Sequence, residues 1–168
     1  EAWPGVEFSE PVSVSFLPGG SKAAFLALRT ALRIDVYDPS SRQRTASLEM
    51  GRPGSVEGWF NAVEEFGFMV TRGGNTARIW DLEAGTLFRE IHAPALLANA
   101  DLTPEGRRIF TRTRTGEVML WDIFTGRTVF PQPIDHEGFG AYAFSPDGEK
   151  LLTHESQKHL LQLWDTRT

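Results

Sequence analysis

Two histidines and a glutamate near the C-terminus are the first residues whose types suggest chemistry. His154, Glu155 and His159 look like the two histidines and the general base of a zinc protease. That site needs two histidines four residues apart on one helical face, so that both reach one zinc ion. Here the spacing is one residue longer, and the segment has the character of a hairpin turn. We therefore assign no metal site to these residues.

Other arrangements that carry catalysis do not emerge from the sequence. Asp135, His136 and Glu137 place a histidine between two carboxylates, which could serve as a general base, but we interpret His136 as a structural loop residue. No serine lies in a Gly-x-Ser-x-Gly elbow, and the paired glycines lack the strand-to-helix setting of a phosphate loop. Cysteine is absent, which excludes thiol chemistry and cysteine-ligated zinc. We predict no catalytic residue, no cofactor and no enzyme activity.

The composition bounds the class of protein. The chain has 168 residues, of which 40% are hydrophobic and 23% charged, which is typical of a globular domain and not of a disordered chain. Its net charge of −5 gives no electrostatic case for binding nucleic acid. No apolar run is long enough for a membrane span, and no targeting segment is visible. We expect no membrane partner and a cytoplasmic location.

A tryptophan–aspartate pair recurs along the chain at intervals of about 42 residues. Such a period indicates one supersecondary unit repeated several times. The copies are Ile79-Trp80-Asp81, Leu120-Trp121-Asp122 and Leu163-Trp164-Asp165, with Val36-Tyr37-Asp38 as a weaker fourth copy.

Two further markers run in phase with these pairs. A proline–glycine turn precedes each of three pairs, as in Phe144-Ser145-Pro146-Asp147-Gly148 and Leu102-Thr103-Pro104-Glu105-Gly106. Gly85 and Gly126 each follow the aspartate of a pair by four residues, which suits a left-handed position in a hairpin turn. The repeat therefore alternates strands with tight turns.

Short runs rich in β-branched and aromatic residues lie between these markers, and no segment keeps a helical period. In the third repeat we expect strands at about 96–102, 108–113, 117–122 and 127–130. Several runs are apolar at successive positions, including Phe68-Met69-Val70 and Leu151-Leu152. Strands that are buried on both faces have this pattern.

These repeats resemble the bacterial type of the WD-repeat β-propeller family over essentially the whole chain. The resemblance implies an all-β propeller of four-stranded antiparallel blades around a central channel. We place four blades in this single domain, at about 12–50, 54–92, 95–131 and 138–168. It also implies a non-enzymatic scaffold that binds a protein or peptide.

The family places a tryptophan in the core of each blade, within a hydrogen-bonded set of histidine, serine or threonine, and aspartate. The resemblance assigns that core position to Trp80, Trp121, Trp164 and, in the first blade, Tyr37. Thr111 and Thr153 fit the threonine position, and His92 and His136 the histidine position. The turn aspartate is absent from every repeat, so the full set cannot form, and stability must depend more on apolar packing.

Basic residues follow the second strand of each blade, at what would be one face of the propeller. We mark Arg29, Arg72, Arg112, Arg114 and His154 as a candidate binding group for an anionic peptide or small ligand. Clustered guanidinium groups bind carboxylate and phosphate through paired hydrogen bonds. The alternative is that these turns are simply polar and their arginines are paired with acidic residues.

The two ends of the chain suggest how the fourth blade is completed. The chain stops just after Trp164-Asp165, before a fourth strand, while residues 1–8 have the character of such a strand. We expect Trp3, Val6 and Phe8 to belong to this closing strand. Closure between two copies would give a homodimeric ring of eight blades, whereas closure within one chain would give four. A fragment of a longer propeller is the third reading.

Three functions follow from these readings. The leading one is a protein- or peptide-binding scaffold that assembles into a closed propeller. An enzyme on the same scaffold would need polar residues that converge at the channel mouth. A purely structural assembly module, or a fragment of a larger signalling protein, would need no partner other than propeller blades. A partner pulldown compared with the mass in solution separates the scaffold from the structural module.

Overall fold

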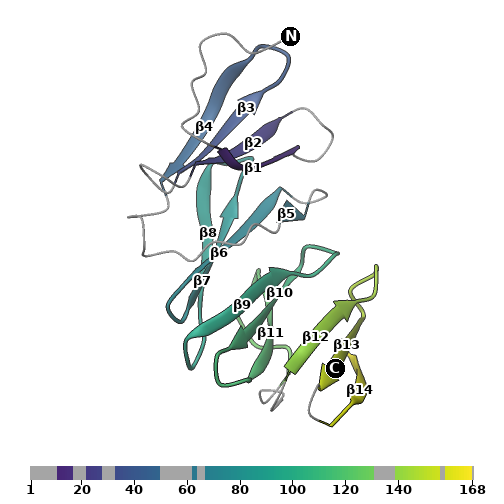
Figure 1. Ribbon diagram of the computed structural model, residues 1–168. Coiled ribbons are helices and arrows are strands. Elements are labelled where there is room, and N and C mark those ends of the chain that lie inside the picture. Colours follow the sequence, from purple (N-terminus) through teal and green to yellow (C-terminus); the bar gives the residue numbers. More distant parts are fainter. Residues whose placement is uncertain are drawn as a thin grey trace.

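The computed structural model describes residues 11–16, 22–27, 33–49, 62–63, 67–130, 139–155 and 158–167. Within these residues every regular element is a β-strand, so the all-β prediction is confirmed for this part of the chain. The strands form four small antiparallel sheets that follow one another in chain order (Figure 1).

Each sheet is built from strands that are consecutive in the sequence. The first sheet contains β1 (Pro11–Phe16), β2 (Ala23–Ala27), β3 (Arg33–Asp38) and β4 (Gln43–Glu49). The second contains β5 (Ala62–Val63), β6 (Phe68–Gly73), β7 (Thr76–Asp81) and β8 (Thr86–His92). The third contains β9 (Leu97–Leu102), β10 (Arg108–Thr113) and β11 (Val118–Asp122). The fourth contains β12 (Phe139–Phe144), β13 (Lys150–Glu155) and β14 (Leu160–Asp165).

The third sheet tests the strands expected from the sequence. Its three strands lie within a residue of the expected bounds. The expected fourth strand at 127–130 is reduced to one bridge, between Trp121 and Thr128. The Val129 amide donates to Leu120 O at 2.7 Å and the Asp122 amide to Arg127 O at 2.9 Å. This segment therefore runs along β11 without forming a full strand.

The aspartate of each repeated pair closes the turn that follows it. Asp122 Oδ1 accepts hydrogen bonds from the Phe124 and Thr125 amides at 3.0 and 2.7 Å, and Asp81 does the same in the second sheet. Aspartate favours such turns because its short side chain reaches the amides two and three residues ahead. The repeated aspartate is thus a turn residue.

A left-handed residue completes this turn in three sheets. Gly85 and Gly126 have φ of 69° and 73°, as the turn glycines were predicted to have. In the first sheet the same position is Arg42, with φ of 59°. A side chain is strained in this region of backbone space, so the first repeat is less well adapted to its own turn.

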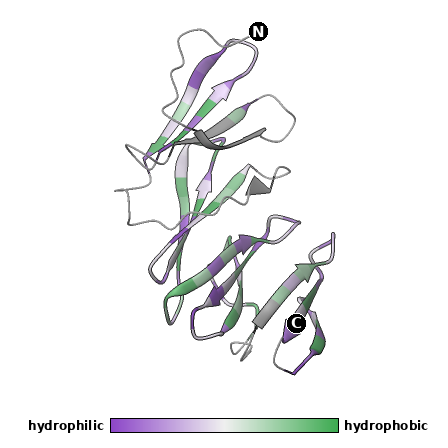
Figure 2. Cartoon of the chain, viewed as in Figure 1, coloured by the Kyte–Doolittle hydropathy of each residue, from purple (hydrophilic) through white to green (hydrophobic). Residues whose placement is uncertain are grey.

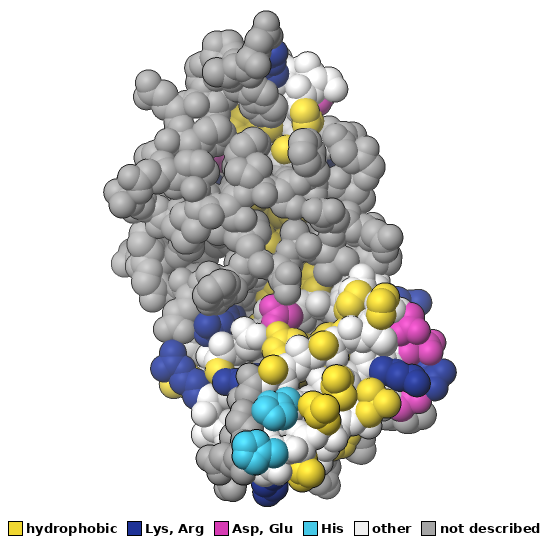
Figure 3. All heavy atoms as spheres, turned by 45° about the vertical axis from the view of Figure 1, so that its right-hand side comes forward, with side chains coloured by type: hydrophobic (Ala, Val, Ile, Leu, Met, Phe, Trp, Pro, Cys, Tyr) yellow, Lys and Arg dark blue, Asp and Glu magenta, His cyan; other side chains and the backbone are white. Residues whose placement is uncertain are grey.

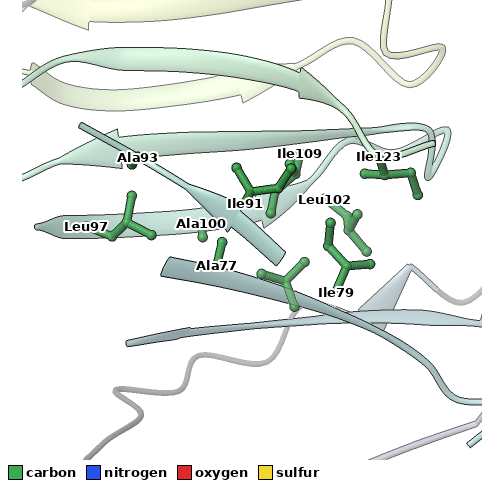
Figure 4. Packing of buried hydrophobic residues seen from close by; sticks show 10 residues of the cluster. Ala77, Ile79, Ile91, Ala93, Leu97, Ala100, Leu102, Ile109 and Ile123 are labelled. Atoms are coloured by element: carbon green, nitrogen blue, oxygen red, sulfur yellow. The ribbon is translucent and has the colours of Figure 1, made fainter. Parts of the chain in front are cut away.

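Apolar side chains fill the space between the second and third sheets (Figure 4). Both sheets contribute residues that are almost fully buried, because adjacent sheets pack face to face. The second sheet contributes Val70, Ala77 and Ile79, and the loop after β8 adds Ala93. The third sheet and its flanking turn contribute Leu97, Ala100, Leu102, Ile109 and Ile123.

A second cluster fills the space between the third and fourth sheets. Phe110, Val118 and Leu120 of the third sheet pack with Leu151 of the fourth, and the partly buried Tyr142, Phe144 and Trp164 surround them. The Tyr142 ring stacks on Phe110, with 4.2 Å between centroids and 24° between planes. The third sheet is therefore buried on both faces. Burial on both faces was predicted for the runs Phe68-Met69-Val70 and Leu151-Leu152; Met69, Val70 and Leu151 are buried, but the prediction is wrong for Leu152, which is 39% exposed.

Candidate interaction surfaces

A tryptophan–threonine hydrogen bond recurs in three sheets. The indole Nε1 of Trp80 donates to Thr71 Oγ1 at 2.9 Å, and Trp121 donates to Thr111 at 2.8 Å. Trp164 donates to Thr153 at 2.9 Å. The sequence reasoning missed Thr71, although a threonine nine to eleven residues before each tryptophan was the available signal. These bonds satisfy the indole donors, so the tryptophans lie in the sheets as packing residues.

The first sheet replaces both members of this pair. Tyr37 lies opposite Ala23, just as Trp80 lies opposite Met69, and Tyr37 is buried. Phe25 occupies the register position of the threonine. Burial raises the pKa of the Tyr37 hydroxyl, and the Asp35 carboxylate raises it further.

His92 does not join a tryptophan–threonine pair. Its ring Nδ1 lies 3.0 Å from Thr76 Oγ1, and its side chain is exposed. The WD-repeat resemblance had placed this histidine in the hydrogen-bonded set. His136, the other expected member, lies outside the described residues, as do Asp135 and Glu137.

The basic residues marked in the sequence occupy one register position in three sheets. Arg72, Arg112 and His154 each lie three residues beyond the residue that pairs with the tryptophan. In the first sheet that position is Leu26, and Arg29 lies outside the described residues. Arg114 follows β10, and its amide donates to Leu96 O at 2.7 Å.

In the second and third sheets this basic position lies on the face that meets the next sheet. Arg72 is two residues from Val70 and Arg112 two residues from Phe110, so each shares the face of its buried apolar neighbour. Arg72 Nη1 donates to the carbonyl oxygen of Leu97, in the third sheet, at 3.0 Å. Arg72 thus ties the second sheet to the third.

Two other arginines also connect neighbouring sheets. Arg89 Nε and Nη2 donate to the carbonyl oxygens of Ile123 and Phe124, both at 2.6 Å. Arg108 Nη1 donates to Thr166 Oγ1 at 3.2 Å. Hydrogen bonds from charged donors are stronger than neutral ones, so these side chains help to fix one sheet against the next.

A polar cluster joins the third and fourth sheets beside their aromatic stack. Asn99 Nδ2 donates to Tyr142 Oη and to Asp101 Oδ2, both at 2.7 Å, and the Tyr142 hydroxyl donates to Asp101. Asn99 and Asp101 share one face of β9, and Tyr142 comes from β12. The cluster satisfies the hydroxyl of a residue whose ring lies in the apolar contact.

Of the three residues first considered for a metal site, Glu155 has another partner. Glu155 is almost fully buried and forms an ion pair with Lys158, with Oε1 2.6 Å from Nζ. His154 is on β13, and His159 lies in the turn before β14 with φ of 52°. Across the described residues no three His, Asp or Glu side chains are grouped as ligands of one ion, and no helix long and apolar enough to cross a membrane occurs.

An exposed apolar surface covers one side of the fourth sheet. Leu152, Leu161 and Leu163 are 39%, 67% and 64% exposed. Leu152 pairs with Leu163, and His154 pairs with Leu161, so all four share one face. Ala143 and Ala141 pair with Leu152 and His154 and extend it. We call this set the leucine face: Leu152, Leu161, Leu163, Ala141, Ala143 and His154.

The leucine face is visible as apolar side chains gathered over the lower part of the molecule, beside histidine rings (Figure 3). Coloured by hydropathy, β14 is largely hydrophobic (Figure 2). Contiguous apolar surface of this kind marks a site of contact in soluble proteins.

Every leucine of this face has a counterpart that is buried between sheets. The counterparts are the residues at the same register positions of the second and third sheets. All six are at most 1% exposed, because the following sheet covers them. They are Val70, Ala77 and Ile79 in the second sheet and Phe110, Val118 and Leu120 in the third.

The outer edge of β14 is also open in the described part of the chain. In the first and second sheets a fourth strand pairs with the strand that carries the repeated aromatic residue, but the fourth sheet ends at β14. The predicted closing strand, with Trp3, Val6 and Phe8, lies outside the described residues. An open edge presents unpaired backbone donors and acceptors.

Comparison with known proteins identifies the fold. No sequence model of a protein family matches the chain, and no curated protein matches it. Among solved structures, the β-propeller domain of Cps50 (Swd1) from Myceliophteria thermophila is similar, with a TM-score of 0.64 and 18% sequence identity. The similarity covers 94% of this chain and 52% of that chain. The fold is therefore of the β-propeller type, and the chain spans about half the length of this neighbour.

Proposed function

We propose that the protein is a non-catalytic interaction scaffold of the WD-repeat type that works by docking further propeller-type sheets and binding proteins. The observation that carries this proposal is the leucine face. It repeats, at the same register positions, the residues that elsewhere make the contact between two sheets. A sheet with this face exposed is adapted to receive a partner.

The WD-repeat assignment is supported by two roles that recur together. The tryptophan of each of three pairs bonds a threonine within its own sheet. The neighbouring aspartate bonds the amides of the following turn, as Asp81 and Asp122 do. The tryptophan fixes two strands of the sheet and the aspartate fixes the turn that follows, so the pair has a structural reason to recur.

The partner that this surface fits is another antiparallel sheet with one apolar face. At each contact between neighbouring sheets, the earlier sheet supplies the counterparts of the leucine face. The later sheet supplies the aliphatic and aromatic side chains that cover them. Such a partner extends the row of sheets towards a closed propeller. The rims of the ring then carry the loops that bind proteins or peptides.

Thiol footprinting tests the docking role. The chain contains no cysteine, so Leu161→Cys carries one thiol on the leucine face. Leu87→Cys is the control, because Leu87 is 43% exposed on the second sheet, away from this face. Maleimide labelling is compared in dilute purified protein and in extract of the source cells. We expect the extract to protect Cys at 161 and not at 87.

Equal labelling at both positions in the extract would contradict the proposed docking role. Hydrolase or lyase turnover by the purified chain, lost on substitution of polar residues at the rim, would favour an enzyme instead.

A further inference from the structure

We propose that the protein binds an acidic peptide at a cluster of three phenylalanine rings between the second and third sheets. The inference rests on the proposed scaffold role and names a second surface and a partner for it, apart from the leucine face of the fourth sheet. We call this set the phenylalanine surface: Phe68, Phe88 and Phe124, with Arg89, Arg107 and Arg127 around them.

The three rings come from three elements and meet at one end of the contact between the two sheets. Phe68 begins β6, Phe88 lies on β8, and Phe124 lies in the turn after β11. The ring centroids are 4.9 Å apart for Phe68 and Phe88, 5.8 Å for Phe88 and Phe124, and 6.4 Å for Phe68 and Phe124. Phe124 follows Ile123, which lies at one end of the buried row in Figure 4. Phe124 is 49% exposed and the other two are partly buried, so the cluster leads from the core to the solvent.

The fold does not require phenylalanine at two of these positions. In every sheet the amide of the second residue after the repeated aspartate, or after its counterpart in the first sheet, donates to that aspartate. The residues at this position are Ser40, Glu83, Phe124 and Arg167. Phe68 pairs with the aspartate of its own sheet, and the third and fourth sheets hold Arg108 and Lys150 there. Aromatic rings at positions that other sheets fill with polar residues indicate a role in binding, because exposed aromatic clusters are typical of interface centres.

Arg89 fixes the exposed ring from below. Its Nε and Nη2 donate to the carbonyl oxygens of Ile123 and Phe124, both at 2.6 Å, and its guanidinium carbon lies 6.0 Å from the Phe88 ring centroid. The Asp122 carboxylate holds the same turn by accepting the Phe124 amide at 3.0 Å. A surface that is already ordered loses little conformational freedom when a partner binds.

Positive charge flanks the exposed ring. The Arg107 carbonyl accepts the Ile123 amide at 3.0 Å, and the Arg127 carbonyl accepts the Asp122 amide at 2.9 Å. Both arginines therefore lie beside the turn that carries Phe124, and their side chains are exposed. Guanidinium groups bind carboxylates through paired hydrogen bonds, so the charge of this surface is complementary to an acidic partner.

The chemistry of the partner follows from these two features. An aromatic or aliphatic side chain covers the Phe124 ring, while carboxylates on either side of it meet Arg107 and Arg127. The net charge of −5 disfavours a polynucleotide. The partner is therefore a short segment with one apolar residue between acidic residues.

Selection from a phage library of random peptides on the purified chain tests the class of partner. We expect the enriched peptides to place an aromatic or aliphatic residue between aspartates or glutamates. No enrichment, or enriched peptides without acidic residues, would overturn the inference. Tighter binding of a single-stranded oligonucleotide than of the enriched peptides would also overturn it.

Fluorescence anisotropy with the most enriched peptide then tests the surface. Phe124→Ser should weaken binding at least about tenfold, and serine suits this turn because Ser40 holds the same position in the first sheet. Arg107→Ala with Arg127→Ala should also weaken binding and remove most of its dependence on salt. Leu96→Ser is the control, because Leu96 is 53% exposed before β9, and it should bind as the unmodified chain does. Circular dichroism checks that each variant is folded, and full affinity in either the Phe124 or the double arginine variant would overturn the inference.

This inference and the docking role of the leucine face fail separately. If the peptide binds through Phe124 but extract leaves a thiol at position 161 unprotected, the docking role is wrong and the phenylalanine surface stands. If extract protects that thiol but no peptide depends on Phe124, the present inference is wrong and the docking role stands.

Discussion

Trp121 Nε1 donates a hydrogen bond of 2.8 Å to Thr111 Oγ1 on the neighbouring strand, and Thr111 is buried. The same relation holds between the corresponding residues of two other sheets. The bond places a large apolar ring within the contact between sheets while its only polar atom is satisfied. Stability should therefore depend on both members of the pair.

Trp121→Ala should lower the free energy of unfolding by about 3–5 kcal/mol, because it leaves a large cavity. Thr111→Val should lower it by about 1 kcal/mol, since it keeps the shape and removes the acceptor. Urea unfolding followed by circular dichroism measures both. The tryptophan would not be a packing residue if Trp121→Ala melted like the unmodified protein.

Arg42→Gly should stabilise the protein by about 1 kcal/mol, because Arg42 has a positive φ of 59° that glycine adopts without strain. Gly85→Ala at the equivalent turn should have the opposite effect. Its φ is 69°, and an added Cβ would lie 3.0 Å from Ala46 Cβ. Thermal melts of the two variants should move in opposite directions, and a destabilised Arg42→Gly variant would contradict this account of the turn.

Arg72→Ala should destabilise the contact between the second and third sheets by about 1.5–3 kcal/mol, the usual range for a hydrogen bond from a charged group. The guanidinium donates to the Leu97 carbonyl at 3.0 Å. Arg78→Ala is the control, because Arg78 pairs with Glu90 of its own sheet and should cost less. Equal losses of stability in the two variants would contradict the role of Arg72 in joining the second and third sheets.

Tyr142→Phe should cost about 1 kcal/mol, because it removes the hydroxyl that bonds Asn99 and Asp101 while the stack on Phe110 remains. Tyr142→Leu should cost more, since the stack is lost as well. Equilibrium unfolding of both variants measures how much the polar cluster and the aromatic stack each contribute to the free energy of unfolding. Identical losses would show that the polar cluster adds nothing.

Acid should weaken the fold through its turn aspartates. Hydrogen bonds from the Ser40 and Ser41 amides lower the pKa of Asp38 from its ordinary 3.8, and the Ser145 hydroxyl lowers that of Asp147. The unfolded chain then takes up protons first. The stabilisation is complete above the ordinary pKa and is lost as the pH falls through the lower folded value.

Urea unfolding at about pH 6 and about pH 3 measures this loss. Asp38→Asn with Asp147→Asn should make stability less dependent on pH in this range. An unchanged dependence in the double variant would place the acid sensitivity in other groups.

The sequence by itself determined the local elements of this protein. Strand bounds such as 108–113 and turn residues such as Gly85 and Gly126 follow from turn chemistry and residue types within a few positions. The repeated tryptophan–aspartate pairs set the period because each sheet needs the same turn and the same packing residue. These features require no knowledge of what lies across the sheet.

Only the tertiary structure decided which face of each strand meets another sheet. Arg72 reads as a polar turn residue in the sequence, but the register places it against the third sheet, where it bonds Leu97. The apolar run Leu151-Leu152 predicts a strand buried on both faces, yet Leu152 is exposed, as are Leu161 and Leu163 on the same face. Whether an apolar side chain is buried depends on a neighbouring sheet far away in sequence, and local patterns carry no information about whether that sheet is present.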